Sequence, residues 1–320
     1  MKKPEILNAE STNYSDKAKK ILESFAKVDY CDLTYASLKI QLSKKTYDAL
    51  IVRLRNPIDE NLLSISPNLK AIATATTGLN HIDTEASFKK RIKIISLQGE
   101  VDFLKNIFAT AEYTWALILS LIRKIPFAHQ TILEGEWDRD HFIGHELHRK
   151  TLGIIGLGRL GSIAAGYAQA FGMTILAHTK NKRILVPEFV TVVDLTTLLK
   201  NSDFISLHLP LTEETIGFIS KPQFLMMEKT PFLINTSRGE IIKEEDLLSA
   251  LQNGLIKGAA LDVLSGEVVS NPLINNPLIE YAKTHDNLII TPHLGGATKE
   301  SMEKTEIFIA KKIRDFFKKC

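Results

Sequence analysis

The sequence predicts an α/β protein of two doubly wound parallel-sheet domains, and three observations support this fold class. Short apolar segments alternate with polar, helix-like segments through the first 97 residues. A glycine-rich turn at residues 156–161 joins an apolar segment to an amphipathic one, and the alternation then resumes as far as residue 291. Because parallel strands need a crossover between them, usually a helix, this rhythm is typical of βαβ units.

In the first domain, the strand at 71–74 is followed by a turn of small residues that reaches residue 78. The N–H groups of such a turn can hold an anion at the carboxyl end of a sheet. The expected elements are strands at 5–7, 48–52 and 71–74 and helices at 16–25 and 59–64.

In the second domain, one long helix is expected at 103–124, kinked or ended by Pro126. Its apolar residues lie around much of its circumference, which indicates a domain junction or a subunit interface. An amphipathic helix at 299–317 follows the last strand of this domain. The other expected elements are strands at 204–207, 232–235, 258–261 and 288–290 and a helix at 243–252 closed by Gly254.

The glycine-rich turn has GxGxxG spacing, with Gly156, Gly158 and Gly161 between a strand and a helix. The first glycine permits the sharp turn, the second leaves room for a pyrophosphate, and the third lets the helix pack against its strand. The N–H groups and the positive dipole end of the helix favour phosphate. In this context the pattern predicts a dinucleotide-binding site.

The residue after the next strand indicates which dinucleotide binds. An acid usually stands there and binds the ribose hydroxyls of NAD, but this chain has Thr179. Lys180, Asn181, Lys182 and Arg183 follow, and they could neutralise a 2′-phosphate. We therefore expect NAD or NADP as cofactor, with NADP slightly favoured, although a solvated basic loop is the alternative reading.

Composition excludes several classes. The 320 residues are 44% hydrophobic, and 40 Lys and Arg against 37 Asp and Glu give a net charge of +3, far from that of a nucleic-acid binder. Cys31 and Cys320 lie near opposite ends of the chain and are expected to be free thiols. The N-terminus does not read as a signal peptide, and the apolar run at 113–122 is too short to span a membrane. We expect a cytoplasmic protein without membrane or nucleic-acid partners.

Three chemically suited residues follow later strands: Arg238 in NTSRGE, Glu267 in LDVLSGE and His293 in TPHLGG. Hydride delivery to a ketone builds negative charge on its oxygen, so the site needs a proton donor and a fixed cation. An imidazolium can supply the proton, and a neighbouring carboxylate would fix its ring. A guanidinium could clamp a carboxylate or carbonyl oxygen.

These motifs, in this order, resemble those of the D-isomer-specific 2-hydroxyacid dehydrogenases, which include phosphoglycerate dehydrogenase, glyoxylate/hydroxypyruvate reductase and D-lactate dehydrogenase. The similarity covers nearly the whole chain. It is carried by TTGLNHID at 76–83, TAE at 110–112, GIIGLGRLG, SLHLPLTEET at 206–215, NTSRG, GAALDV at 258–263 and TPHLGG.

The resemblance implies an NAD(P)-dependent oxidoreductase of small 2-keto acids and D-2-hydroxy acids. Arg238 would then bind substrate, His293 would be the acid/base and Glu267 its partner. The substrate carboxylate would be bound at Thr76, Thr77 and Gly78, with Arg53 close to the substrate's far end. Cofactor contacts would come from the three glycines, Arg159, Leu160, Thr179, Lys180, His208, Pro210, Thr215, Thr236, Ser237 and Asp262, of which His208 could instead be structural.

The resemblance also implies how the domains are organised. A Rossmann cofactor domain at 99–292 would be inserted in a flavodoxin-like substrate domain formed by 1–98 and 293–320. A homodimer through the cofactor domain would occupy the long helix and the segment around Trp137.

The chain departs from the family pattern at a few positions. Thr179 replaces the usual acid, Val268 follows Glu267 where proline is usual, and Leu54 stands where a small polar residue is common. Two other functions remain open on the same scaffold: a dinucleotide-sensing, corepressor-like binding protein, and a formate or phosphite dehydrogenase. Formate enzymes typically pair the histidine with an amide rather than a carboxylate. His141, His145 and His148 are interpreted as a polar loop, and no metal site is expected.

Overall fold

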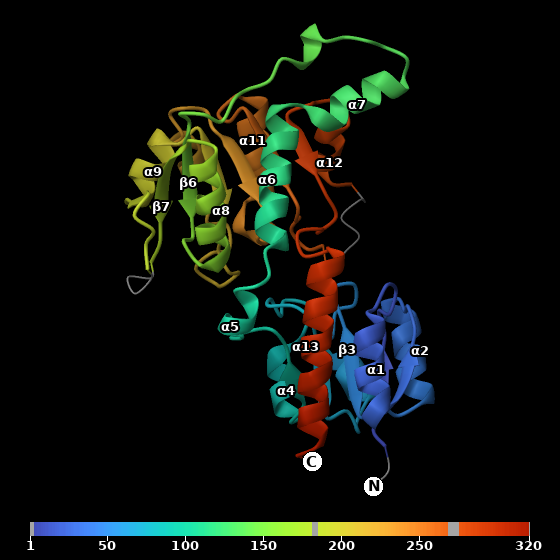
Figure 1. The fold of residues 1–320 in the computed structure, drawn as a ribbon. Coiled ribbons are helices and arrows are strands. Elements are labelled where there is room, and N and C mark those ends of the chain that lie inside the picture. Colours follow the sequence, from blue (N-terminus) through green and yellow to red (C-terminus); the bar gives the residue numbers. More distant parts are fainter. Residues whose placement is uncertain (1–2, 181–184, 268–274, 320) are drawn as a thin grey trace. The chain divides into compact units, whose positions relative to one another are not determined.

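The computed structural model describes residues 3–180, 185–267 and 275–319, which divide into two α/β units (Figure 1). Of these, the first unit contains 3–107 and 297–319, and the second contains 108–267 and 275–296. The first division falls nine residues after the predicted position at 98, and the second falls four residues after the one at 292. Leu104 and Ile107 explain the first difference, because both are buried in the core of the first unit.

The first unit has a parallel five-stranded sheet in the order β2-β1-β3-β4-β5, which is the flavodoxin-like order. Apolar clusters cover both faces, and α13 lies beside α1 on one of them (Figure 1). The strands are β1 (Glu5–Asn8), β2 (Lys27–Tyr30), β3 (Ala49–Val52), β4 (Ala71–Thr74) and β5 (Lys93–Ile95). The helices are α1 (Asp16–Phe25), α2 (Tyr35–Lys44), α3 (Glu60–Ile65), α4 (Thr84–Lys89), α5 (Val101–Leu104) and α13 (Lys299–Phe317).

The second unit has a parallel seven-stranded sheet in the order β12-β11-β10-β9-β6-β7-β8. The strand order reverses beside β6, and ligands of doubly wound sheets bind at such a switch point. The strands are β6 (Thr151–Ile155), β7 (Thr174–His178), β8 (Val190–Val192), β9 (Phe204–Leu207), β10 (Phe232–Asn235), β11 (Gly258–Leu261) and β12 (Leu288–Ile290). The helices are α6 (Ala109–Ile122), α7 (Ile125–Leu133), α8 (Arg159–Ala170), α9 (Leu195–Asn201), α10 (Lys221–Leu225), α11 (Glu244–Gln252) and α12 (Pro277–Ala282), with 3-10 turns at Asp140–Phe142 and Gly239–Ile241.

The single helix expected at 103–124 is wrong, because α5 ends at Leu104 and α6 begins at Ala109. Leu104 belongs to the core of the first unit and Trp115 to that of the second, so the two helices belong to different units. Pro126 does not kink this helix either. Lys124 has a left-handed φ of 51°, and Pro126 lies in the first turn of a new helix, where its missing N–H costs nothing.

The length and hydropathy of the helices bear on membrane insertion. None of those in the described ranges is both long and apolar enough to cross a membrane. The longest, α13, carries charged residues throughout its length and buries one face against the first unit.

Candidate active site

The glycine turn after β6 is built by backbone that approaches too closely for side chains. Gly156 has a φ of 99°, and a Cβ there would lie 2.3 Å from the carbonyl oxygen of His208. A Cβ on Gly161 would lie 2.2 Å from the carbonyl oxygen of Gly156, so α8 can pack on β6 only without one. Both glycines are therefore required by the local fold itself.

Gly158 differs from these two because a Cβ there would meet nothing within 4 Å. It is the N-cap of α8 and, being a glycine, has no side chain to cap the first turn of that helix. Arg159 and Leu160 begin the helix, and burial lowers the pKa of Arg159. An open backbone at an uncapped helix N-terminus fits a dinucleotide pyrophosphate.

The SLHLPLTEET segment is held largely by its own hydrogen bonds. The Oγ1 of Thr215 donates to the carbonyl oxygen of Pro210 at 2.7 Å. Nε2 of His208 lies 2.9 Å from Oγ of Ser206, while Nδ1 is buried without a hydrogen-bond partner in the described part of the chain. Burial lowers the pKa of His208 to about 4, so its imidazole is neutral near pH 7.

The residues after β10 are also tied to their neighbours. Oγ of Ser237 donates to the carbonyl oxygen of Leu207 at 2.6 Å, and Oγ1 of Thr236 lies 2.8 Å from Oγ1 of Thr114. These bonds connect the NTSRG turn to β9 and to α6. They therefore hold the turn in place in the protein alone, before any ligand binds.

The end of β7 bears on cofactor choice. Thr179 follows His178, the last residue of the strand, and is partly buried. Nζ of Lys180 lies 2.7 Å from Oε2 of Glu214, and both side chains are exposed. Asn181, Lys182 and Arg183, on which the NADP reading also depends, lie outside the described residues.

Glu267 and His293 are 26 positions apart in the sequence but lie in direct contact. Nδ1 of His293 is hydrogen-bonded to Oε1 of Glu267, whose Oε2 accepts the N–H of Leu264 at 3.1 Å. With Nδ1 facing the carboxylate, Nε2 is the ring nitrogen that can exchange a proton with a ligand. Val268, noted for replacing a usual proline, lies outside the described residues.

Asp262 holds the turn that carries His293. Its buried carboxylate accepts hydrogen bonds from Oγ1 of Thr291 and from the N–H groups of Leu294 and Gly295, each at 2.7 Å. Its carbonyl oxygen accepts the N–H of His293 at 2.8 Å. Burial raises the pKa of Asp262, while these hydrogen bonds act in the opposite direction. His293 has a left-handed φ of 56°, which is uncommon for histidine, and the bonds to Asp262 keep it there.

Arg238 follows β10, whose carboxyl end lies at the same edge of the sheet as those of β11 and β12. Its Nη1 donates to the carbonyl oxygen of Ser237 at 2.6 Å. Burial lowers the pKa of the guanidinium, and Glu267 and Glu240 oppose that shift. A Cβ on Gly239 would lie 2.0 Å from the carbonyl carbon of Leu264, so the turn after Arg238 packs directly on the loop that leads to Glu267. The second unit therefore brings Arg238, Glu267 and His293 to one edge of its sheet.

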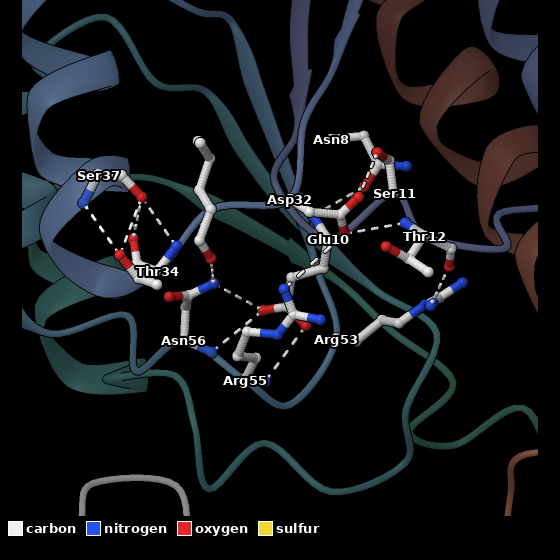
Figure 2. Close-up of polar contacts among 11 residues, drawn as sticks. Asn8, Glu10, Ser11, Thr12, Asp32, Thr34, Ser37, Arg53, Arg55 and Asn56 are labelled. Atoms are coloured by element: carbon white, nitrogen blue, oxygen red, sulfur yellow. Dashed lines mark hydrogen bonds and ion pairs between the residues drawn. The ribbon is translucent and has the colours of Figure 1, made fainter.

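The other candidate residues belong to the first unit. Oγ1 of Thr76 donates to the carbonyl oxygen of Gly78 at 2.7 Å, which stabilises the turn after β4, and Thr77 is exposed. Nη1 of Arg53 donates to the carbonyl oxygen of Thr12 at 2.9 Å (Figure 2). Its Nη2 forms an ion pair with Glu306 of α13. Arg53 thus follows β3 and is fixed by two other segments of its own unit.

The three clustered histidines have structural contacts. The ring of His145 packs edge-on against Phe232 with centroids 5.5 Å apart, and His141 packs edge-on against Phe142. His148 fills the space beside Gly172, where a Cβ would lie 2.5 Å from its Nδ1. Cys31 is a free thiol, and Cys320 lies outside the described residues.

Comparison with known proteins identifies the family. The model of the D-isomer specific 2-hydroxyacid dehydrogenase NAD binding domain matches residues 115–295. D-3-phosphoglycerate dehydrogenase of Synechocystis sp. is 38% identical over 272 residues, which is 84% of this chain and 47% of that protein. The chain belongs to the D-isomer-specific 2-hydroxyacid dehydrogenase family.

Other relatives in this 2-hydroxyacid dehydrogenase family are similar over most of their length. Glyoxylate reductase of Thermococcus litoralis is 36% identical over 280 residues, 85% of this chain and 81% of that protein. The structure of D-lactate dehydrogenase from Aquifex aeolicus has a TM-score of 0.81 and 30% identity, covering 98% of this chain and 95% of that one. The chain spans about half the length of the phosphoglycerate dehydrogenases it matches, 47% and 49%.

For this family member, sequence reasoning missed residues that act through others. Asn235 accepts the N–H of Ser237 at 2.9 Å and donates to the carbonyl oxygen of Arg238 at 2.8 Å, so it shapes the NTSRG turn. Glu244 accepts the N–H of Ser265 at 2.6 Å and supports the loop before Glu267. Asn235 ends a strand, which is a usable signal, but nothing near Glu244 in the sequence points to Ser265.

Proposed function

We propose that this protein is an NAD(P)-dependent oxidoreductase of small 2-keto acids and D-2-hydroxy acids. The observation that carries the proposal is the contact between His293 and Glu267 beside Arg238, in a unit whose glycine turn fits a dinucleotide. Family membership supports this reaction class. The acid could be of the phosphoglycerate, glycerate/hydroxypyruvate or glyoxylate class.

The residues would divide the chemistry between them. A bound nicotinamide supplies the hydride that reaches C2 of the keto acid, or accepts it in the reverse direction. His293 would protonate the carbonyl oxygen through Nε2, while Glu267 fixes the ring and stabilises its positive charge. Arg238 would bind the carboxylate or the carbonyl oxygen and stabilise developing negative charge. Thr76, Thr77 and Gly78 would bind the substrate carboxylate through the turn after β4.

The cofactor proposal is that NADPH serves at least as well as NADH. Thr179 offers no carboxylate to repel a 2′-phosphate, and Lys180 follows it. Arg159 and Leu160 would lie at the phosphates, and Asp262 near the nicotinamide amide. Asp262 already accepts three hydrogen bonds from the turn that carries His293, so we assign it first to positioning that turn.

The test is a screen of purified protein for NADH and NADPH oxidation with glyoxylate, hydroxypyruvate, pyruvate and 3-phosphohydroxypyruvate. We expect turnover with at least one of them. In His293→Ala, kcat should fall about a hundredfold or more while cofactor affinity is kept. Cofactor binding without turnover would favour the dinucleotide-sensing reading. NAD reduction by formate or phosphite alone would indicate a formate or phosphite dehydrogenase.

We also propose a homodimer formed through the second unit. Apolar side chains on α7 and after it are exposed in the single chain, and the exposed fraction of Trp137 is 89%. The other members of this group are Ile125, Ile132, Leu133 and Ile143. Burial of these side chains would stabilise a dimer. Light scattering of Trp137→Asp should show a shift toward monomer, and an unchanged mass would contradict this interface. We also propose a cytoplasmic location.

A further inference from the structure

We propose that Glu306 adapts the substrate site to acids without a phosphate group at the end remote from the reacting carbonyl. The inference rests on the proposed function, in which Arg53 faces that end of the substrate. It concerns selectivity among 2-keto acids, which the family alone does not decide.

Arg53 is already paired inside its own unit. Its Nη2 contacts Oε1 of Glu306, and the side chain of Glu306 is only 2% exposed. Oε2 of Glu306 accepts the N–H of Ser15 at 2.7 Å. This carboxylate therefore cannot move away from the guanidinium without leaving a buried group unpaired.

Tyr14 completes the surroundings of Arg53. Its ring centre lies 5.9 Å from the guanidinium carbon, and the side chain is buried. Burial, and after it the charge of Glu306, raises the pKa of the Tyr14 hydroxyl, so the group stays neutral. The neutral tyrosine therefore adds no charge to the cluster, and the negative charge of Glu306 is not offset by it.

The second arginine after β3 also lies beside acidic residues (Figure 2). Nη1 of Arg55 lies 3.8 Å from Oδ1 of Asp32. The backbone N–H of Arg55 donates to buried Glu10 at 3.2 Å, and Glu10 also accepts the N–H of Asn56 at 3.1 Å. Both arginines that could attract a phosphate thus lie beside carboxylates.

The charges in this cluster sum to a negative value. Arg53 and Arg55 contribute two positive charges, and Glu10, Asp32 and Glu306 contribute three negative ones. A phosphate dianion at Arg53 would meet the buried carboxylate of Glu306, where solvent screens the repulsion poorly. A hydroxyl or a hydrogen at the same place would meet no such repulsion, and the remaining N–H groups of Arg53 can donate to a hydroxyl.

The experiment compares kcat/KM for hydroxypyruvate and 3-phosphohydroxypyruvate in wild type and Glu306→Gln. Wild type should prefer hydroxypyruvate. The amide keeps the size of the side chain and removes its charge. The ratio of kcat/KM for the phosphorylated substrate to kcat/KM for the unphosphorylated one should therefore rise about tenfold in the variant. A wild type that prefers the phosphorylated substrate would overturn the inference and leave the proposed function standing.

Glu303→Gln is the matched control. Glu303 lies three positions earlier on α13 and pairs with Lys17 at 2.7 Å, but it is exposed. Glu303→Gln removes the same charge from the same helix, so an equal change in the kcat/KM ratio would also overturn the inference. If circular dichroism shows that Glu306→Gln does not fold, Asp32→Asn replaces it, and the ratio should then rise a few-fold.

Calorimetry with D-3-phosphoglycerate and D-glycerate gives a reading that does not need turnover. Glu306→Gln should gain affinity for the phosphorylated acid relative to D-glycerate, and no gain would contradict the inference. If wild type reduces neither keto acid, the proposed function fails for both, while this binding ratio still decides whether Glu306 discriminates against phosphate.

Discussion

Nδ1 of His293 is hydrogen-bonded to Oε1 of Glu267, and this contact ties the turn after β12 to the loop after β11. The same carboxylate accepts the N–H of Leu264, so its position is set by backbone as well as by the imidazole. An imidazole held in this way presents Nε2 in one orientation. That orientation is what a proton donor to a carbonyl oxygen requires.

Glu267→Gln should lower kcat for keto-acid reduction about 10- to 100-fold. The amide oxygen can still accept a hydrogen bond from Nδ1, but it does not stabilise a positive charge on the ring. Cofactor affinity should stay within about twofold, because the change lies outside the glycine turn. Steady-state kinetics from about pH 5 to pH 9, with cofactor titration by fluorescence, provide the measurement. A kcat equal to that of wild type at every pH would refute the assigned pairing.

Asp262→Asn should damage the turn that carries His293. The carboxylate accepts three hydrogen bonds at 2.7 Å, and an asparagine has one oxygen for them. We expect unfolding free energy to fall by about 2 kcal/mol and kcat/KM by about tenfold or more. Urea unfolding and steady-state kinetics measure the two effects. Thr291→Val removes one of the three donors, so its unfolding free energy and kcat/KM should fall less than those of Asp262→Asn. Larger losses in Thr291→Val would contradict this role for Asp262.

Much of this arrangement could be predicted because parallel sheets gather their functional residues at one edge. Arg238, Glu267 and His293 were identified as residues that follow β10, β11 and β12, and the structure places those strands side by side. Strands β9 to β12 are fully apolar or nearly so, which made their bounds readable.

The parts that could not be predicted depend on contacts between distant segments or on weak local patterns. Glu306 lies in a helix of ordinary amphipathic pattern, and only the packing of α13 brings it to Arg53. β2 lies at a sheet edge and is polar, so it lacks the apolar run that marks a strand. The break between α5 and α6 arises because the chain passes from one core to another, which no helical periodicity records.

Thr179→Asp should move cofactor preference toward NADH. A carboxylate after β7 can bind the ribose hydroxyls and would repel a 2′-phosphate, so the ratio of kcat/KM with NADPH to that with NADH should fall about tenfold or more. Glu214→Gln should move the ratio the other way by a few-fold, since it frees Lys180 from its ion pair. Kinetics with both cofactors measure the ratio, and an unchanged value in Thr179→Asp would place the adenosine ribose elsewhere.

His208 should make the second unit sensitive to acid. Burial lowers its pKa from 6.5 to about 4, so between these values the unfolded chain binds a proton that the folded chain does not. The stability that the neutral ring contributes is present above about pH 6.5 and is lost as the pH falls toward 4, by at most about 3 kcal/mol. Urea unfolding at about pH 7 and about pH 4.5 should show a smaller acid loss in His208→Gln than in wild type. Equal losses would mean that the ring is protonated in the folded protein.

Substitutions at Gly161 and Gly166 distinguish the effect of close packing at a helical glycine from the effect of helix propensity. A Cβ at Gly161 would lie 2.2 Å from the carbonyl oxygen of Gly156, whereas one at Gly166 of the same helix would meet nothing within 4 Å. Gly161→Ala should push α8 away from the turn, lower the unfolding free energy by about 1–3 kcal/mol and weaken cofactor binding about tenfold or more. Gly166→Ala should raise stability by up to about 1 kcal/mol and leave cofactor affinity unchanged, because alanine favours the helix without a clash. Thermal unfolding and fluorescence titration with NADPH distinguish the two, and equal cofactor affinities in both variants would show that close packing of α8 on the turn is not what forms the binding site.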